Sequence, residues 1–309
     1  MKPTLVVVVG PTAVGKTALS IRLAEHFGTE IVSADARQVF RETTIGTAKP
    51  TAEEQNRVRH HLIDFLSVEQ SYDVKQYEQD ALAALTNIFR RSSWAIATGG
   101  SGLYVKTLCH GIDDLPEVSV AVRETLRKRW EAEGLEALVA ELARVDPDYH
   151  ATVDRQNHRR VLRALEVFYS SGFPYSVFQG QKSVADRPFR ILTIGLTLPR
   201  DILYSRIERR VDEMIEAGLV EEARALYPWR QQQALRTVGY QELFPVFEGK
   251  YALEEAIRLI KRNTRRYAKR QLTWFRKDPT IHWLDAGEKE DELTQRVTAY
   301  LSQVRNQEI

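Results

Sequence analysis

Short apolar runs alternate with amphipathic segments in the first hundred residues of the chain. Residues 5–9, 30–34 and 94–98 are short and largely apolar, as in strands that are buried on both faces. Between these runs, residues 16–27 and 72–91 carry apolar side chains at helical spacing. This strand–helix order is typical of a parallel sheet covered by helices on both sides, so we predict an α/β fold.

The alternation stops near residue 110 and resumes near residue 190. Residues 111–186 contain helical patterns and no convincing strand. Residues 190–197 predict a further strand and residues 201–217 a long helix, with more helices after it. We therefore predict an α/β core formed by residues 1–110 and 187–309, interrupted at residues 111–186 by a mostly helical insertion.

Composition and charge distribution indicate the kind of partner and the cellular compartment. The net charge is only +2, but basic residues cluster at 123–129, 155–163 and 258–277. Local basic faces on a near-neutral protein favour a polyanionic partner, although each cluster alone is equally typical of a solvated helix face. The single cysteine, Cys109, excludes an internal disulfide and suits a reducing cytosol. No apolar run reaches the roughly 18 residues of a membrane span.

The strongest chemical signal lies between the first predicted strand and the first predicted helix. Residues 10–17 match the pattern G-x-x-x-x-G-K-[ST], which places the core in the P-loop NTPase-like class. The glycines let backbone N–H groups converge on phosphate oxygens at a positive helix N-terminus. Lys16 adds a charge for the terminal phosphate, and the Thr17 hydroxyl is a natural Mg²⁺ ligand. The predicted phosphate-binding residues are Gly10, Pro11, Thr12, Ala13, Val14, Gly15, Lys16 and Thr17.

The position of the acidic residue separates this chain from most kinases. Kinases and NTPases usually place a magnesium-binding carboxylate at the end of a later strand, but residues 94–98 run into Gly-Gly-Ser-Gly at 99–102. Asp35 instead ends the second predicted strand, where it faces the same crevice as the loop. The position of Asp35 alone is compatible with three roles, those of a metal ligand, a general base and a turn-forming residue, and does not decide between them. A small-molecule kinase that uses ATP stays an alternative at this point.

Three further patterns have both a chemical and a structural interpretation. His60 and His61 suggest a metal site, but neighbours on a strand point to opposite faces, so packing and hydrogen bonding are favoured. Arg206 and Arg210 share one helix face. They bind a diphosphate between them if that face is directed into the crevice, and otherwise they are a solvated pair. Residues 255–274 combine basic and aromatic side chains, which suits a packed helix or RNA.

Nine short segments, in order along the chain, carry a resemblance to a known family. They are GPTAVGKT at 10–17, DARQVF at 35–40, IGTAKP at 45–50, HHLID at 60–64, GGSGLY at 99–104, RVLRALEV at 160–167, RIERR at 206–210, VGY at 238–240 and KRQLTW at 269–274. Together they resemble the tRNA dimethylallyltransferases, also called tRNA isopentenyltransferases, of the bacterial type. A phosphate-binding loop alone is a weak basis, whereas this ordered set spans most of the chain.

The resemblance implies a reaction and a role for four residues. A dimethylallyl group is transferred from dimethylallyl diphosphate to N6 of the adenosine 3′-adjacent to the anticodon in tRNA, and diphosphate leaves. Asp35 matches the family's general base, Arg210 an arginine that stabilises the diphosphate, and Ser101 a position that contacts the target nucleotide. The implied cofactor is Mg²⁺ at Thr17, and the implied partner is the anticodon stem-loop of tRNA. We expect a cytoplasmic monomer.

The resemblance also implies which residues hold the RNA. They are Asp35, Ala36, Arg37, Gln38, Ser101, Arg123, Arg159, Arg160, Val161, Leu162, Arg163, Arg236, Thr237, Val238, Gly239, Tyr240 and Gln241. Two positions depart from the family's pattern, since Ala36 stands where the family usually has Ser and Ser101 where it usually has Thr. The remaining alternatives are a prenyltransferase for free adenine nucleotides and an RNA-binding protein without catalytic activity.

Overall fold

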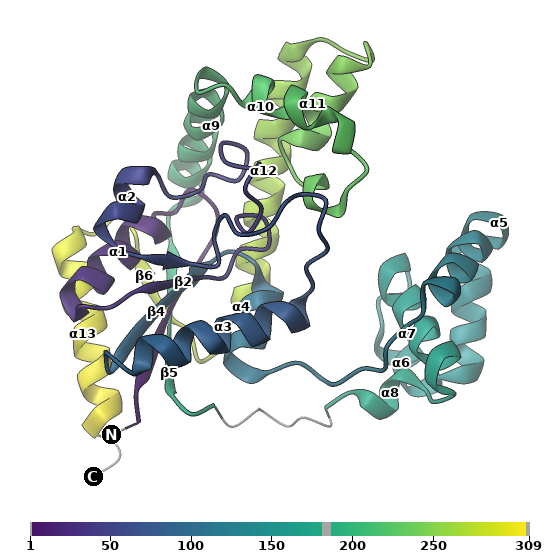
Figure 1. The fold of residues 1–309 in the computed structure, drawn as a ribbon, viewed down its shortest axis with the longest axis horizontal. Helices are drawn as coiled ribbons and strands as arrows, with labels where there is room; N and C mark the ends of the chain where they lie inside the picture. The colour runs from purple at the N-terminus through teal and green to yellow at the C-terminus, as the bar shows by residue number, and fades with distance from the viewer. Residues whose placement is uncertain (1, 181–186, 307–309) are drawn as a thin grey trace. The chain divides into compact units, whose positions relative to one another are not determined.

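A six-stranded parallel sheet lies at the centre of the fold in this computed structural model, which describes residues 2–180 and 187–306. Its strand order is β3-β2-β4-β1-β5-β6, and neighbouring strands pair in parallel throughout (Figure 1). The strands are β1 (Thr4–Val9), β2 (Ile31–Ser33), β3 (His60–His61), β4 (Trp94–Gly99), β5 (Arg190–Thr197) and β6 (His282–Asp285). The predicted α/β class with a parallel sheet is confirmed, and β5 coincides with its predicted range.

Helices connect these strands. They are α1 (Lys16–Phe27), α2 (Ala52–Arg57), α3 (Val74–Phe89), α4 (Gly102–His110), α5 (Val120–Val145), α6 (Pro147–Thr152), α7 (His158–Ser171), α8 (Tyr175–Phe178), α9 (Arg200–Glu216), α10 (Leu219–Leu226), α11 (Tyr240–Phe247), α12 (Leu253–Phe275) and α13 (Glu290–Asn306). In the part of the chain that the structure describes, no helix is long and apolar enough to cross a membrane.

Local sequence signals account for the ends of the first long helices. The helix α1 ends at Gly28, whose φ of 58° is left-handed and is easily adopted by glycine. The helix α3 follows Asp73, whose carboxylate accepts the N–H groups of Lys75 and Gln76 in a capping box. Its apolar face, which includes Tyr77 and Leu85, is buried as the helical spacing predicted.

The strand β1 is buried on both faces because its side chains alternate between two apolar layers. Val6 and Val8 pack in a cluster with side chains of α1 and α13. Leu5, Val7 and Val9 pack in a second cluster with side chains of α3 and α4. Figure 1 shows α1 and α13 along one side of the sheet and α3 along the other. Helices therefore cover both faces of the sheet, as predicted.

A third apolar cluster positions the helices that follow β5. Leu219 of α10, Tyr240 and Leu243 of α11 and Ile260 of α12 pack together with Phe40, which comes from the segment after β2. This cluster attaches α10, α11 and α12 to the segment that carries Asp35.

The chain divides into two compact units, Met1–Cys109 with Arg187–Ile309, and His110–Asp186. The second unit is built from α5 to α8, and its described residues contain no strand. Its own core includes Leu126, Leu138, Leu142 and Leu165. Each unit thus buries a separate apolar core.

Two elements near the C-terminus were not predicted. The strand β6 pairs with β5 and extends the sheet at its edge. Trp283 of β6 packs against Gly195 of β5, where a Cβ would approach the indole to 2.7 Å. The helix α13 then returns to the sheet and buries Leu293, Val297 and Leu301. The strand β6 has four residues and one buried side chain, so its local pattern is too short to identify it.

Candidate active site

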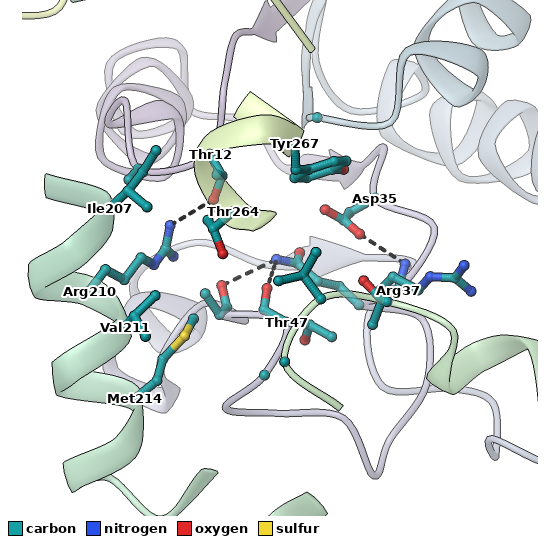
Figure 2. Close-up of a pocket in the computed structure, with 18 of the residues that line it drawn as sticks. Thr12, Asp35, Arg37, Thr47, Ile207, Arg210, Val211, Met214, Thr264 and Tyr267 are labelled. Carbon is teal, nitrogen blue, oxygen red and sulfur yellow. Dashed lines mark hydrogen bonds between the residues drawn. The ribbon is translucent and has the colours of Figure 1, made fainter. Parts of the chain in front are cut away.

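A cavity of about 150 Å³ lies where the phosphate-binding loop, the end of β4 and the helices α9 and α12 meet. Its described lining comes first from the N-terminal half of the sheet: Thr12, Ala13, Lys16 and Thr17 of the loop, Asp35, Arg37 and Gln38 after β2, residues 46–48, and Thr98, Gly99 and Gly100 at the end of β4. The rest comes from the later helices and their connections: Ile207, Arg210, Val211 and Met214 of α9, Leu219, residues 237–239, and Ile260, Thr264, Tyr267 and Gln271 of α12. Figure 2 shows Arg210 and Asp35 on opposite sides, both directed into the cavity. The carboxyl ends of parallel strands form such crevices in α/β proteins.

The phosphate-binding loop has the backbone that its glycines allow. Gly10 and Gly15 have φ values of 148° and 106°, in the range that favours glycine. A Cβ on Gly10 would come within 2.7 Å of the carbonyl oxygen of Leu196 on β5. The predicted position of the loop, between a strand and the first turn of α1, is what the structure shows.

Lys16 is partly desolvated in the cavity. Its ammonium donates a hydrogen bond to the carbonyl oxygen of Pro11, 2.8 Å away. The pKa of Lys16 is lowered to about 8, chiefly by burial and also by the neighbouring charge of Arg210, while Asp35 acts in the opposite direction. Near neutral pH the side chain is therefore mostly a cation that is poised to meet an anion.

Arg210 reaches the phosphate-binding loop from α9. Leu203, Ile207 and Val211 form the buried stripe of this helix, and that packing turns Arg210 toward the loop. Its Nη1 donates to the Thr12 hydroxyl at 3.4 Å (Figure 2). Burial lowers the pKa of Arg210 from its ordinary value, but the guanidinium stays charged. Arg206 is not among the lining residues, so one arginine of the predicted pair faces the cavity.

Asp35 has the turn-forming role, one of the three that its position left open, and it also faces the cavity. Its Oδ1 accepts the N–H of Arg37 at 2.9 Å, which is the turn-forming interaction. The same carboxylate lines the cavity, and it is the one acidic side chain among the described lining residues. The turn holds the carboxylate in a defined orientation at the edge of the cavity.

Ser101 supports the Asp35 segment instead of lining the cavity. Its hydroxyl accepts the N–H of Ala36 at 3.0 Å. Ser101 is not among the described lining residues. The Ser101 oxygen thus supports the backbone next to Asp35, and a contact of this hydroxyl with the target nucleotide stays a prediction.

Sequence reasoning missed the residue that holds the segment at 44–46. One carboxylate, that of Glu222 on α10, accepts three consecutive N–H groups, from Thr44 at 2.9 Å, Ile45 at 2.8 Å and Gly46 at 2.9 Å. The Tyr240 hydroxyl donates to the same carboxylate at 2.7 Å. Nothing local in the sequence marks Glu222, because its three backbone partners lie more than 170 residues away in the chain.

The cavity also contains polar groups that the motifs did not single out. The Thr98 hydroxyl of β4 is buried and has no hydrogen-bond partner among the described residues. Tyr267 and Thr264 face the cavity from α12 (Figure 2). Burial raises the pKa of Tyr267 well above its ordinary range, with the charge of Asp35 adding to the effect, so its hydroxyl stays protonated.

The two adjacent histidines have the structural role that was favoured. His60 Nδ1 contacts the carbonyl oxygen of Val58 at 2.8 Å, and His61 Nε2 contacts Glu30 at 2.6 Å. Their rings bind different partners, as expected for neighbours on a strand. The described part of the chain holds no group of three His, Cys, Asp or Glu side chains arranged for a metal.

The donor set at the cavity fits an Mg²⁺ ion that arrives with a phosphorylated ligand. The Thr17 hydroxyl is an oxygen ligand in the lining, next to Lys16 of the phosphate-binding loop. Mg²⁺ commonly takes one or two protein oxygens together with phosphate oxygens and waters. A single hydroxyl therefore suits a diphosphate-bound ion better than a metal cage made by the protein alone.

The predicted RNA contacts fall into three groups. Arg37, Gln38, Thr237, Val238 and Gly239 line the cavity. Arg123, Arg159, Arg160, Arg236 and Gln241 are exposed, whereas Leu162 and Arg163 are half-buried. The side chains of Val161 and Tyr240 are fully buried, which corrects the expectation that they touch RNA: Val161 belongs to the core of the second unit, and Tyr240 packs in the third cluster.

Comparisons with known proteins agree with the geometry. Residues 38–278 match a family described as IPP transferase. The chain is 50% identical over 285 residues to the tRNA dimethylallyltransferase of Cytophaga hutchinsonii, which covers 92% of this chain and 93% of that relative.

Solved structures match as well. The full-length tRNA isopentenylpyrophosphate transferase from Bacillus halodurans has 39% identity and a TM-score of 0.72, covering 98% of this chain and 96% of that one. A eukaryotic dimethylallyltransferase acting on tRNA has 26% identity and a TM-score of 0.83, covering 99% of this chain and 80% of that one.

Proposed function

The chain belongs to the IPP transferase family, and we propose that its cavity transfers a dimethylallyl group from dimethylallyl diphosphate to N6 of the adenosine 3′-adjacent to the anticodon in tRNA. One observation carries the assignment of the site. The phosphate-binding loop, Arg210 and Asp35 line the same cavity, and Asp35 is the one acidic residue in its described lining. The strand β4 ends in glycine, where many kinases have a magnesium-binding carboxylate.

Asp35 is the general base of the proposed reaction. The exocyclic amine of adenine is a poor nucleophile because its lone pair is delocalised into the ring. As the new N–C bond forms, a proton must leave N6, and the Asp35 carboxylate accepts it. Because Oδ1 already accepts the N–H of Arg37, Oδ2 is the oxygen offered to N6.

The opposite side of the cavity stabilises the leaving group. As the allylic C–O bond breaks, its electron pair moves onto the diphosphate. Backbone N–H groups of the loop, the Lys16 ammonium and the Arg210 guanidinium meet this growing negative charge. One such preorganised contact contributes about 3 kcal/mol, or roughly a hundredfold in rate. Thr17 would hold an Mg²⁺ ion at this end of the cavity, and the ion would supply further charge neutralisation.

Apolar side chains in the same cavity suit the dimethylallyl group. They are Ile207, Val211, Met214, Leu219, Val238 and Ile260. Their side chains exclude water from the allylic carbon, which protects a group with cationic character from hydrolysis.

The adenosine must leave the stack of the anticodon loop to reach Asp35. Arg37, Gln38 and Thr237 line the cavity, and we assign them to contacts with the extruded nucleotide. Extrusion costs a few kcal/mol, so contacts with the RNA backbone are needed to offset it, and we assign them to exposed arginines such as Arg159 and Arg160. We expect a cytoplasmic enzyme, since tRNA is the substrate, and a monomer.

Mass spectrometry of a synthetic anticodon stem-loop tests this function. The protein is incubated with Mg²⁺, dimethylallyl diphosphate and the stem-loop, and a second stem-loop carries guanosine at the target position. We expect one prenyl group on the adenosine-containing RNA, equimolar diphosphate, and no change in the control RNA. Prenylation of AMP in preference to the stem-loop, or ADP formation from ATP, contradicts the proposal.

A further inference from the structure

The side-chain amide of Gln271, near the end of α12, joins two loops of the cavity. Its Oε1 accepts the N–H of Thr12 in the phosphate-binding loop at 2.9 Å. Its Nε2 donates to the carbonyl oxygen of Gly100, directly after β4, at 3.0 Å. Gln271 is only 5% exposed and lies 259 residues from Thr12 in the chain.

The two contacts require an amide at this position. Thr12 offers a donor and Gly100 an acceptor, so the side chain between them must present one acceptor and one donor. A carboxylate supplies only acceptors and a thioether no donor. The fit is also tight, because a Cβ on Gly100 would overlap the Gln271 nitrogen. Ala268 and Phe275, on the preceding and following turns of α12, are buried and hold the helix in place.

The contacts of Gln271 belong to a longer path across the site. On one side, the Thr12 hydroxyl accepts a hydrogen bond from Arg210. On the other side, Ser101 follows Gly100 and accepts the N–H of Ala36, next to Asp35. The path therefore runs from the diphosphate end of the cavity to the general base.

We propose that Gln271 is a positioning residue for prenyl transfer, which sets the separation between the phosphate-binding loop and the Asp35 segment. This inference rests on the proposed function. Displacement at carbon requires the nucleophile and the leaving group in line, with the reacting atoms about 3–3.5 Å apart. A shift of about 1 Å in such a geometry costs roughly a hundredfold in rate. The two ends can each bind their ligand without this bridge, but they then lose their alignment.

The test separates alignment from binding and from folding. In Gln271→Met the volume is nearly kept and both hydrogen bonds are lost. We expect kcat to fall about a hundredfold, while KM for dimethylallyl diphosphate and Kd for the stem-loop change by less than about threefold. Gln271→Glu keeps the acceptor for Thr12 and loses the donor to Gly100, so its kcat is also reduced. The exposed Gln79 of α3 provides the control, Gln79→Met, which leaves kcat unchanged.

A double variant provides a readout that a purely structural role does not change. Ser101→Ala breaks the same path on the Asp35 side. In the Ser101→Ala background, Gln271→Met should therefore reduce kcat by a much smaller factor than in the wild type. If the two factors multiply, if kcat is unchanged in both Gln271 variants, or if activity falls only in proportion to the folded fraction, Gln271 has no positioning role. Wild-type protein that does not prenylate the stem-loop contradicts the proposed function itself, and this inference with it.

Discussion

The ammonium of Lys16 donates a hydrogen bond to the Pro11 carbonyl oxygen, 2.8 Å away, so the phosphate-binding loop closes on its own lysine. Since the pKa of Lys16 is lowered to about 8, the side chain changes charge within the pH range of ordinary enzyme assays. The positive form of Lys16 binds a diphosphate more tightly than the neutral form does, so the contribution of the ammonium to affinity is retained below this pKa and lost as the pH rises through it.

We therefore predict that Kd for dimethylallyl diphosphate rises by up to about tenfold per pH unit above pH 8. Calorimetric titration between about pH 7 and pH 9.5 measures this, a range in which the ligand's phosphates are mostly deprotonated, since the last pKa of a phosphate monoester is about 6. Lys16→Met should bind weakly at every pH in this window. A wild-type affinity that does not change between pH 7 and pH 9.5 contradicts the role given to the ammonium.

Asp35→Asn removes the base and keeps the turn. The asparagine Oδ1 still accepts the N–H of Arg37, so the segment should keep its conformation. We expect a loss of about 10²- to 10⁴-fold in kcat, the usual contribution of a general base, with Kd for tRNA nearly unchanged. Single-turnover prenylation and RNA binding measure the two quantities. Turnover that equals the wild type rules out Asp35 as the base.

Glu222→Gln weakens the hydrogen bonds that hold the segment at 44–46. The amide has one acceptor oxygen in place of two and brings an N–H group toward backbone donors. We expect a loss of about 1–3 kcal/mol in the free energy of unfolding. We also expect a higher KM for the substrates, because residues 46–48 line the cavity. Urea unfolding measures the first effect. Glu221→Gln, at the neighbouring exposed position, is the control and should change neither quantity.

Arg160 is exposed on α7, whereas Arg163 already pairs with Glu166 at 3.4 Å. If these residues contact RNA phosphates, their replacement by Gln raises Kd for tRNA and reduces the dependence of log Kd on log salt. Each phosphate contact that is lost should reduce this slope by about 0.7–0.9, with the larger effect for Arg160. Arg296→Gln on α13, where Arg296 pairs with Glu288, is the control. Equal slopes for the wild type and Arg160→Gln exclude a phosphate contact there.

Met214 is one of three described residues, with Ala48 and Arg210, that line two neighbouring cavities. It lines the active-site cavity, and it also lines a neighbouring cavity of about 470 Å³ between α9 and residues 44–64. Met214→Ala should join the two spaces, so we predict that the variant accepts geranyl diphosphate better than the wild type does. The ratio of kcat/KM for geranyl and dimethylallyl diphosphate measures this preference. A ratio that does not rise shows that another residue limits the chain length.

Most of the core could be predicted because its signals are local. The periods of apolar side chains identified β1, β2, β4, α1 and α3 in the first hundred residues, though not the short α2 and β3, and they identified β5 within its observed bounds. The strand β6 could not be predicted in this way, because four residues with one buried side chain carry no period. It becomes a strand because the edge of β5 offers hydrogen-bond partners.

The site was partly predictable for the same reason. The predictions for Lys16, Thr17 and Asp35 came from motif and strand position, and these residues do meet at one cavity. The choice between Arg206 and Arg210 depended on which face of α9 packs against the core. Ser101 shows the limit of this reasoning, since a hydroxyl at that position can face the ligand or the backbone, and here it binds Ala36.

The sequence by itself determined the phosphate-binding loop, the strand–helix order and the acidic residue after β2, because each depends on residues that are close in the chain. Only the tertiary structure decided that Gln271 holds Thr12 and that Glu222 holds residues 44–46. Both are hydrogen bonds between groups far apart in sequence, and such contacts form only after the sheet and its helices have packed.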